Sequence, residues 1–249
     1  MRIIISPAKK MQVDSDTLAV RNLPLFLKET QVLMRCLQRL ESQALQKLWQ
    51  CSESIATLNE RRLAQMDLEQ NLTPALLAYE GIQYQYMAPG IFEEEQYEYL
   101  EQHLRIISGF YGVLRPFDGV VPYRLEMQAR LAVGQAKNLY EYWGAQLALQ
   151  LAGEADVIVN LASKEYSKAI LPYLPQGVRV ITCQFGELLA GKIVEKGITC
   201  KMARGKMVRF LAEYKIREYE EIKQFNELNY CFAEEWSTEQ NYVFLKGGK

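Results

Sequence analysis

The chain has 249 residues, with 29 Lys and Arg against 30 Asp and Glu and a single histidine. Its composition, 49% apolar and 24% charged, is typical of a globular protein and excludes a disordered one. With His103 alone, neither a two-histidine metal site nor an HExxH motif exists, and we expect no metal and no cofactor.

The sequence carries no signal for a membrane or for secretion. It contains no run of about twenty apolar residues, and the apolar run at 3–5 is too short for a signal peptide. The five cysteines are odd in number and widely spaced, with no CxxC pair. We therefore predict a reduced, cytoplasmic protein that does not bind a membrane.

Hydrophobic periodicity and turn residues predict a mixture of helices and strands. Thr73 and Pro74 are typical of the start of a helix, and the three glutamates at 93–95 suit a helix N-terminus. In chain order we expect a strand at 2–6, helices at 24–40, 42–50, 53–66, 73–80 and 93–107, a strand at 123–127, a helix at 138–151, a strand at 157–161, a helix capped by Ser163, a strand at 178–183, a hairpin at 188–195, a helix at 201–217, and strands at 228–233 and 241–246.

No repeat, low-complexity tract or Gly/Ser/Pro-rich linker marks a domain boundary, so we predict that residues 1–249 form a single domain. The helices and strands are interspersed without strict βαβ alternation. This order favours an α+β fold in which a mixed β-sheet is surrounded by helices.

The formal net charge of −1 hides strongly charged segments. Three basic segments, 1–50, 105–137 and 201–217, have net charges of +4, +3 and +5. Two acidic segments, 51–104 and 218–249, have net charges of −8 and −4. The near-neutral total therefore does not exclude a nucleic-acid partner, which a basic surface patch would attract.

The predicted helix at 201–217 has the most pronounced pattern of the basic segments. Its apolar residues recur at helical spacing, and we expect them to form one stripe against the core. Lys201, Lys206 and Arg209 would then project from the opposite face, where Glu213 is the one acidic residue within the run. Pairing at i,i+4 would not neutralise such a face. The stripe comprises Ala203, Met207, Phe210, Leu211 and Tyr214.

Three loops carry candidate chemistry. Ser6-Pro-Ala-Lys9 follows the first strand, and Lys9 and Lys10 could contact a phosphate. The segment 160–168 joins a strand to a helix, and such a junction presents N–H groups and lysines to an anion. Gly109 and Gly112 have the spacing of a phosphate-binding turn. The simpler interpretation is that they mark the end of a helix followed by a turn. No nucleophile, base and orienting group occur together, so the sequence favours binding over catalysis.

Six blocks spread along the chain resemble the YaaA family of peroxide-stress proteins. None of these blocks is a generic motif. They are Ile-Ser-Pro-Ala-Lys at 5–9, Leu-Arg-Ile-Ile-Ser-Gly-Phe-Tyr-Gly-Val-Leu-Arg-Pro at 104–116, Pro-Tyr-Arg-Leu-Glu-Met at 122–127, Leu-Tyr-Glu-Tyr-Trp-Gly at 139–144, Asn-Leu-Ala-Ser-Lys-Glu-Tyr at 160–166 and Ala-Arg-Gly-Lys-Met-Val-Arg-Phe at 203–210.

The resemblance implies an α+β fold particular to that family, with a basic cleft and a helix-hairpin-helix element. We place that element on the helix at 201–217, the connection at 217–220 and a short helix reaching Phe225. The resemblance also implies binding to duplex or junction-like DNA, and a role in surviving hydrogen peroxide alongside DNA repair. The residues that we expect to contact DNA phosphates are Lys9, Lys10, Arg115, Arg124, Lys164, Lys168, Lys201, Arg204, Lys206 and Arg209.

Two other functions fit the same residues. In the first, the protein is an enzyme that acts on a nucleotide-like or phosphorylated small substrate, held in a pocket between the loops Ser6–Lys9 and Asn160–Lys168. In the second, it is a scaffold whose opposite charge blocks pair within an oligomer. The sequence does not indicate an oligomeric state or a DNA structure preference.

Overall fold

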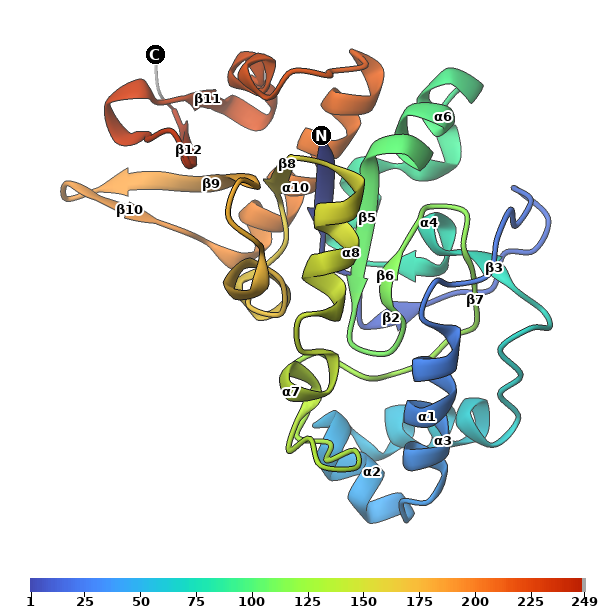
Figure 1. Ribbon diagram of the computed structural model, residues 1–249. Helices are drawn as coiled ribbons and strands as arrows, with labels where there is room; N and C mark the ends of the chain where they lie inside the picture. The colour runs from blue at the N-terminus through green and yellow to red at the C-terminus, as the bar shows by residue number, and fades with distance from the viewer. Residues whose placement is uncertain (248–249) are drawn as a thin grey trace.

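A mixed sheet of eight strands runs through the computed structural model, which describes residues 1–247 (Figure 1). The strand order is β11-β12-β9-β8-β1-β5-β6, and β10 pairs with β9. The five strands from β12 to β5 are parallel, whereas β6, β10 and β11 are antiparallel to their neighbours. The strands are β1 (Arg2–Ile5), β5 (Leu104–Ser108), β6 (Gly112–Leu114), β8 (Val157–Asn160), β9 (Arg179–Leu189), β10 (Lys192–Val194), β11 (Tyr230–Phe232) and β12 (Asn241–Lys246).

Helices surround this sheet, which confirms the predicted fold class. Two short strand pairs lie beside the sheet, β2 (Lys10–Met11) with β4 (Tyr79–Glu80) and β3 (Thr73–Pro74) with β7 (Gly119–Val120). Across residues 1–247, no helix is both long enough and apolar enough to pass through a bilayer. The helices are α1 (Leu27–Gln38), α2 (Ser42–Trp49), α3 (Glu53–Ala64), α4 (Ala75–Ala78), α5 (Ile82–Met87), α6 (Glu94–His103), α7 (Leu139–Trp143), α8 (Gln146–Glu154), α9 (Lys164–Ser167) and α10 (Gly197–Glu213), with a 3-10 helix at Tyr219–Gln224.

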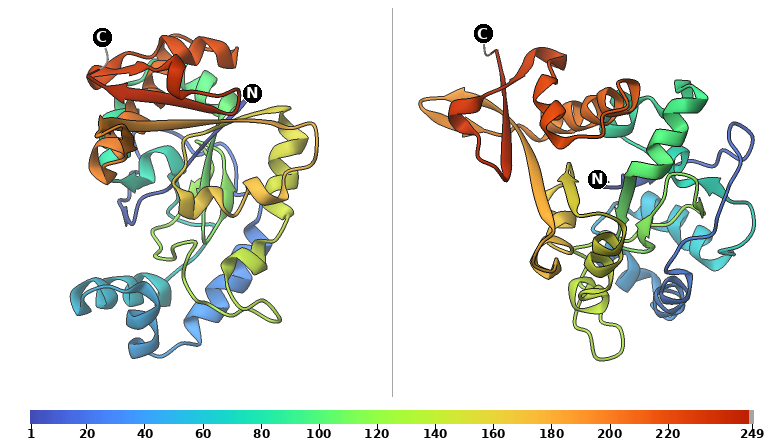
Figure 2. Two further views of the ribbon diagram at one scale, coloured as in Figure 1. Left: turned by 90° about the vertical axis from the view of Figure 1, so that its left-hand side faces the viewer. Right: turned by 45° about the horizontal axis from the view of Figure 1, so that its top comes forward.

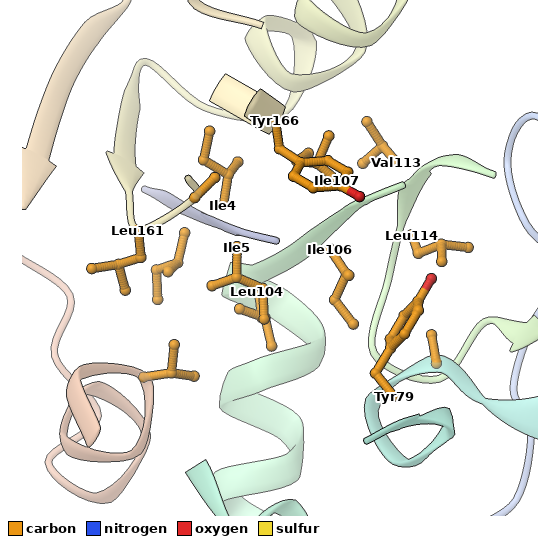
Figure 3. Close-up of a cluster of buried hydrophobic side chains, with 14 of the residues drawn as sticks. Ile4, Ile5, Tyr79, Leu104, Ile106, Ile107, Val113, Leu114, Leu161 and Tyr166 are labelled. Atoms are coloured by element: carbon orange, nitrogen blue, oxygen red, sulfur yellow. The ribbon is translucent and has the colours of Figure 1, made fainter. Parts of the chain in front are cut away.

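Strand β1 lies in the middle of the sheet, between β5 and β8. Its residues Ile3, Ile4 and Ile5 are fully buried, because helices cover both faces of the sheet. Figure 3 shows the alternation of side chains that a strand imposes: Ile4 lies on one side of the sheet and Ile5 on the other. Continuous β-branched residues are the sequence pattern of such a doubly covered strand, and this explains why the first strand could be predicted.

The two faces of the sheet are covered by different helices (Figures 1 and 2). Helix α8 lies on one face, and α6 and α10 lie on the other. An ion-pair network ties α8 to the sheet, since Glu154 accepts from Arg2 Nε at 2.7 Å and from Arg105 Nε at 2.8 Å. Arg105 is 5% exposed, so this buried guanidinium has the carboxylate partner that its burial requires.

Several predicted elements differ from the observed ones. The helix expected at 93–107 ends at His103, and 104–108 is the buried strand β5. The helix expected at 138–151 is interrupted at Gly144, whose φ is +48°. Only Ala75–Ala78 is helical in the segment 73–80, because Thr73 pairs with β7 and its hydroxyl accepts from Asp14 N rather than capping a helix.

No strand forms at 123–127, although Tyr123, Leu125 and Met127 are buried. These side chains alternate toward the core as a strand would, but the backbone packs on Gly109 instead of pairing with a strand. A Cβ on Gly109 would lie 2.7 Å from the Leu125 carbonyl oxygen. Gly112 is also buried, against Phe26, Trp143 and Leu147, so the glycine spacing does not form a phosphate-binding turn.

The prediction of one apolar stripe on the basic helix was incomplete, and it was wrong for Tyr214, which follows the last helical residue and is 69% exposed. Helix α10 begins at Gly197 and is buried on a second side as well, through Gly205, Val208 and Ala212. This second side packs against α5, and a Cβ on Gly205 would lie 2.1 Å from the Gln83 carbonyl oxygen. Only glycine permits the two helices to approach this closely.

Gly205→Ala should therefore lower the free energy of unfolding by about 2 kcal/mol or more, because the clash is with backbone rather than with a movable side chain. Gly153→Ala in α8 is the matched control, since a Cβ at that position would have nothing within 4 Å and alanine is the better helix former. Denaturant unfolding measures both variants. Equal effects of the two substitutions would contradict the tight contact between the helices.

Candidate functional site

The main candidate site is a cavity of about 390 Å³ at the carboxyl ends of β1 and β8. The chain leaves β1 toward β5 on one side of the sheet, and leaves β8 toward β9 on the other. At such a change of direction the loops diverge and open a crevice, which is where ligands bind in open α/β sheets. The lining residues are Ser6, Pro7, Ala8, Lys9, Lys10, Glu80, Gly81, Ile82, Gln83, Tyr84, Glu126, Ser163, Glu165, Tyr166, Lys201 and Arg204.

The two loops that the sequence singled out meet in this cavity. The Ser163 backbone N–H donates to Ser6 Oγ at 2.8 Å, and Ser6 Oγ donates to Ser163 Oγ at 3.2 Å. Tyr84 donates its hydroxyl proton to the Ser6 carbonyl oxygen at 3.1 Å, which joins α5 to the same loop. Ser163 occupies the N-cap position of α9 as predicted, but its hydroxyl bonds to Ser6 instead of capping the helix.

Two lysines of the cavity are paired with carboxylates. Lys10 Nζ lies 2.7 Å from Glu80 Oε1, and Lys9 Nζ lies 3.3 Å from Glu126 Oε1. Arg124 also approaches Glu126 Oε1, at 3.2 Å, but that oxygen accepts no bond with hydrogen-bond geometry within residues 1–247. The Glu126 carboxylate is thus held by the charges of Lys9 and Arg124 at a buried oxygen.

Glu165 supplies a second carboxyl group. Burial raises the pKa of Glu165, and the nearby negative charge of Glu126 raises it further. A hydrogen bond that Glu165 accepts from the Gln128 backbone N–H at 3.2 Å lowers the pKa and so opposes this rise. The cavity therefore contains one carboxylate held by two cations and one carboxyl group with a raised pKa. Such a pair of carboxyl groups can accept hydrogen bonds from hydroxyl or amino groups of a ligand.

Two donors of the cavity have no partner within residues 1–247. They are Arg204 Nε on α10 and Gln83 Nε2 on α5, and both atoms are buried. Gln83 is 6% exposed, and burial lowers the pKa of Arg204. The close packing at Gly205 places these two helices together and buries both atoms. A largely buried guanidinium without an acceptor is costly, and an anion bound in the cavity would remove that cost.

The structure gathers part of the predicted basic set at this cavity. Lys9, Lys10, Lys201 and Arg204 line it, Arg124 reaches it through Glu126, and Lys164 follows Ser163. Lys201 and Arg204 have no ion-pair partner among residues 1–247. These two cations come from α10, far along the chain from Lys9, so the sequence could not show that they share a site.

Besides Arg124 and Lys164, four more predicted contact residues lie outside the cavity lining, each with its own partner. Arg115 pairs with the fully buried Asp118 at 2.8 Å, and Lys168 stacks over the Tyr140 ring. On α10, Lys206 pairs with Glu227 at 3.4 Å, and Arg209 pairs with Glu213 at 2.7 Å. The expectation that i,i+4 pairing leaves this helix uncompensated was therefore wrong for Arg209, which is paired in that way.

Other residues of the site were not found from the sequence. No sequence motif marks Gln83 and Tyr84, because their place in the cavity depends on how α5 packs against α10 and the loop after β1. Glu165 and Tyr166 lie within the 160–168 segment, in which the sequence predicted a ligand contact only for the lysines. Among residues 1–247, no group of three or more His, Cys, Asp or Glu side chains is placed to hold a metal ion.

Comparison with known proteins identifies the family. Residues 1–236 match the family described as "Peroxide stress protein YaaA". The chain belongs to this family. Its relatives include UPF0246 proteins of Desulfitobacterium hafniense (strain Y51), 52% identical over 99% of this chain and 98% of the relative, and of Pediococcus pentosaceus, 49% identical over 99% and 98%. A UPF0246 protein of Lachnoclostridium phytofermentans is 50% identical over 99% of this chain and 97% of the relative.

In this YaaA-family protein the Arg115–Asp118 pair allows a test by pH. Burial raises the pKa of Asp118 to about 6, against the hydrogen bonds from Arg115 that lower it. A carboxyl whose pKa is raised in the folded state takes up a proton on acidification before the unfolded chain does. Its contribution to stability therefore improves as the pH falls from 7 toward 4.

The free energy of unfolding of the parent protein, relative to that of Asp118→Asn, should rise by about 1 kcal/mol between pH 7 and pH 5. Asparagine cannot titrate, so the variant removes the pH dependence while keeping the side-chain shape. Urea unfolding at the two pH values provides the measurement. Parallel pH dependences of the two proteins would show that Asp118 does not titrate in this range.

Proposed function

We propose that this YaaA-family protein acts in the response to hydrogen peroxide by binding DNA through its backbone phosphates, at the basic rim of the cavity between β1 and β8. The observation that carries the proposal is the convergence of basic side chains from three separate segments at one end of the sheet. Lys9 and Lys10 follow β1, Lys164 begins α9, and Lys201 lies on α10.

The exposure of these lysines favours contact with a large partner. All four are exposed at the surface, with side-chain exposures of 61% for Lys9 and 73% for Lys10. Lysine approaches a phosphate as a flexible point charge and reads no base edge, so the binding that we propose is independent of DNA sequence. Phosphate contact also releases counterions, which makes the affinity strongly dependent on salt.

If the four lysines of the rim neutralise about four phosphates, the logarithm of the association constant should fall with the logarithm of salt concentration with a slope of about −3.6. Lys10→Ala combined with Lys164→Ala should make this slope less steep by about 2, because each lysine removes about one phosphate contact. Filter binding of a duplex across a salt series measures the slope.

The matched control is Lys28→Ala combined with Lys192→Ala. These two exposed lysines lie on α1 and β10, and neither lines the cavity, while the change in net charge is the same. We expect the control to retain the parental slope. Absence of duplex binding at low salt, or an equal loss in both double variants, would refute DNA binding at this rim.

A further inference from the structure

We infer that the interior of the cavity is a binding site for a single nucleotide unit, a phosphate ester attached to a polar ring system. The site shares Lys201 with the exposed lysine rim to which we assign DNA contacts, but Arg204 and Gln83 contribute buried atoms and are not part of that rim. It would exist whether or not that rim binds DNA, because it depends on buried groups that a duplex laid across the rim would not reach.

Four basic side chains line the cavity against three glutamates, and the two basic residues that form no ion pair within residues 1–247 both lie on α10. Lys9 and Lys10 are offset by Glu126 and Glu80. Lys201 and Arg204 are left without an anionic partner among residues 1–247, and their spacing of three residues places them on the same side of α10. Gln83 Nε2, on the helix packed against α10, is an unpaired donor beside them. Two cations and an amide donor on one wall suit a phosphate group.

Other residues of the lining have the opposite chemistry. Glu126 and Glu165 contribute two carboxyl groups to the cavity. These acceptors would repel a second phosphate, but they fit the hydroxyl or amino groups of a sugar or a base. Tyr84, Tyr166 and Ile82 also line the cavity and provide aromatic and apolar surface for a ring. One anionic end and one neutral, donor-bearing end together describe a nucleotide rather than a simple anion.

The size of the cavity supports one unit rather than several. About 390 Å³ lies near the lower end of the roughly 300–1,000 Å³ typical of small-molecule sites. A base that is paired within a duplex could not enter it. The nucleotide would therefore be either a free mononucleotide or one unpaired nucleotide displaced from a DNA strand, as in proteins that extrude a base into a pocket.

The guanidinium of Arg204 provides the sharpest test. Arg204→Met keeps the length of the side chain but removes a largely buried charge that has no partner within residues 1–247. We expect this variant to be at least as stable as the parent, because replacing an uncompensated buried charge by an apolar group is neutral or stabilising. We also expect its affinity for a deoxynucleoside 5′-monophosphate to fall at least tenfold, because a charge-assisted hydrogen bond is lost.

The measurement is titration calorimetry with each of the four deoxynucleoside 5′-monophosphates, with the corresponding nucleosides and with inorganic phosphate, together with the unfolding temperature of each protein. At least one monophosphate should bind ten times more tightly than its nucleoside and than phosphate. Arg209→Met is the matched control, since Arg209 lies on the same helix, pairs with Glu213 and does not line the cavity. This control should bind the nucleotide as the parent does.

Several results would overturn the inference: no binding of any monophosphate, binding of inorganic phosphate as tight as that of the nucleotide, or unchanged affinity in Arg204→Met. If the parent binds nucleotide but Lys10→Ala with Lys164→Ala does not weaken DNA binding, the cavity inference stands and the proposed DNA rim fails. If instead the parent binds no nucleotide but Lys10→Ala with Lys164→Ala weakens DNA binding, the cavity inference fails and the proposed DNA rim stands.

A competition arm separates the two sources of the nucleotide. A duplex with one unpaired, extrahelical nucleotide should displace the bound mononucleotide if the site receives nucleotides from DNA, while a fully paired duplex of equal length should not. If neither duplex displaces it, the site takes free nucleotides. Both results support a nucleotide site and differ only in its source.

Discussion

The pairing of β1 with parallel strands on both of its edges is the constraint on which the arrangement of this protein depends. Because β1 is fully buried at Ile3–Ile5 and hydrogen-bonded to β5 and β8, its carboxyl end has one fixed position in the middle of the sheet. The chain departs from β1 and from β8 in opposite directions, and this divergence opens the cavity. The hydrogen bonds between Ser6 and Ser163 then hold the two loops together at its base.

A second constraint, the close approach of α5 and α10 at Gly205, gives the cavity its chemistry. This contact buries polar atoms of Gln83 and Arg204 without giving either side chain a full set of partners in the described part of the chain. Elsewhere in the same protein, arginines that are withdrawn from solvent are compensated: Arg105 has Glu154, and Arg115 has Asp118. Unsatisfied buried donors are few in native proteins, and a ligand-binding role accounts for their persistence at a cavity wall.

The charge pattern shows how a basic segment can serve two purposes. On α10, Lys206 and Arg209 are tied to acids of the protein itself, and they stabilise the packing of the C-terminal part of the chain. Lys201 and Arg204, on the same helix, line the cavity and form no ion pair within residues 1–247, although the negative charge of Glu195 acts on Arg204. Membership in the peroxide stress family gives this surplus charge a biological setting, and nucleic-acid phosphate is the anion that we propose for it.

The sequence by itself determined the mixed fold class, most helices and strands, the family, and the two loops that meet at the cavity. These features are local: hydrophobic periodicity, turn residues and motif blocks are read within a few residues of one another. It did not reveal that 104–108 is a strand, because that segment is buried on both faces and its apolar run fits a helix equally well. It also placed a strand at 123–127, where burial alternates but the backbone pairs with no strand.

Only the tertiary structure decided which basic residues share a site. Lys9, Lys201 and Arg204 come together because the sheet order and the α5–α10 contact bring distant segments to one edge. Arg115 and Arg209 form ion pairs with acidic residues three and four positions away, and these pairs depend on the local backbone conformation. Side-chain partnership is a property of distance in space, and distance in space between remote segments is set by packing rather than by any local pattern of residues.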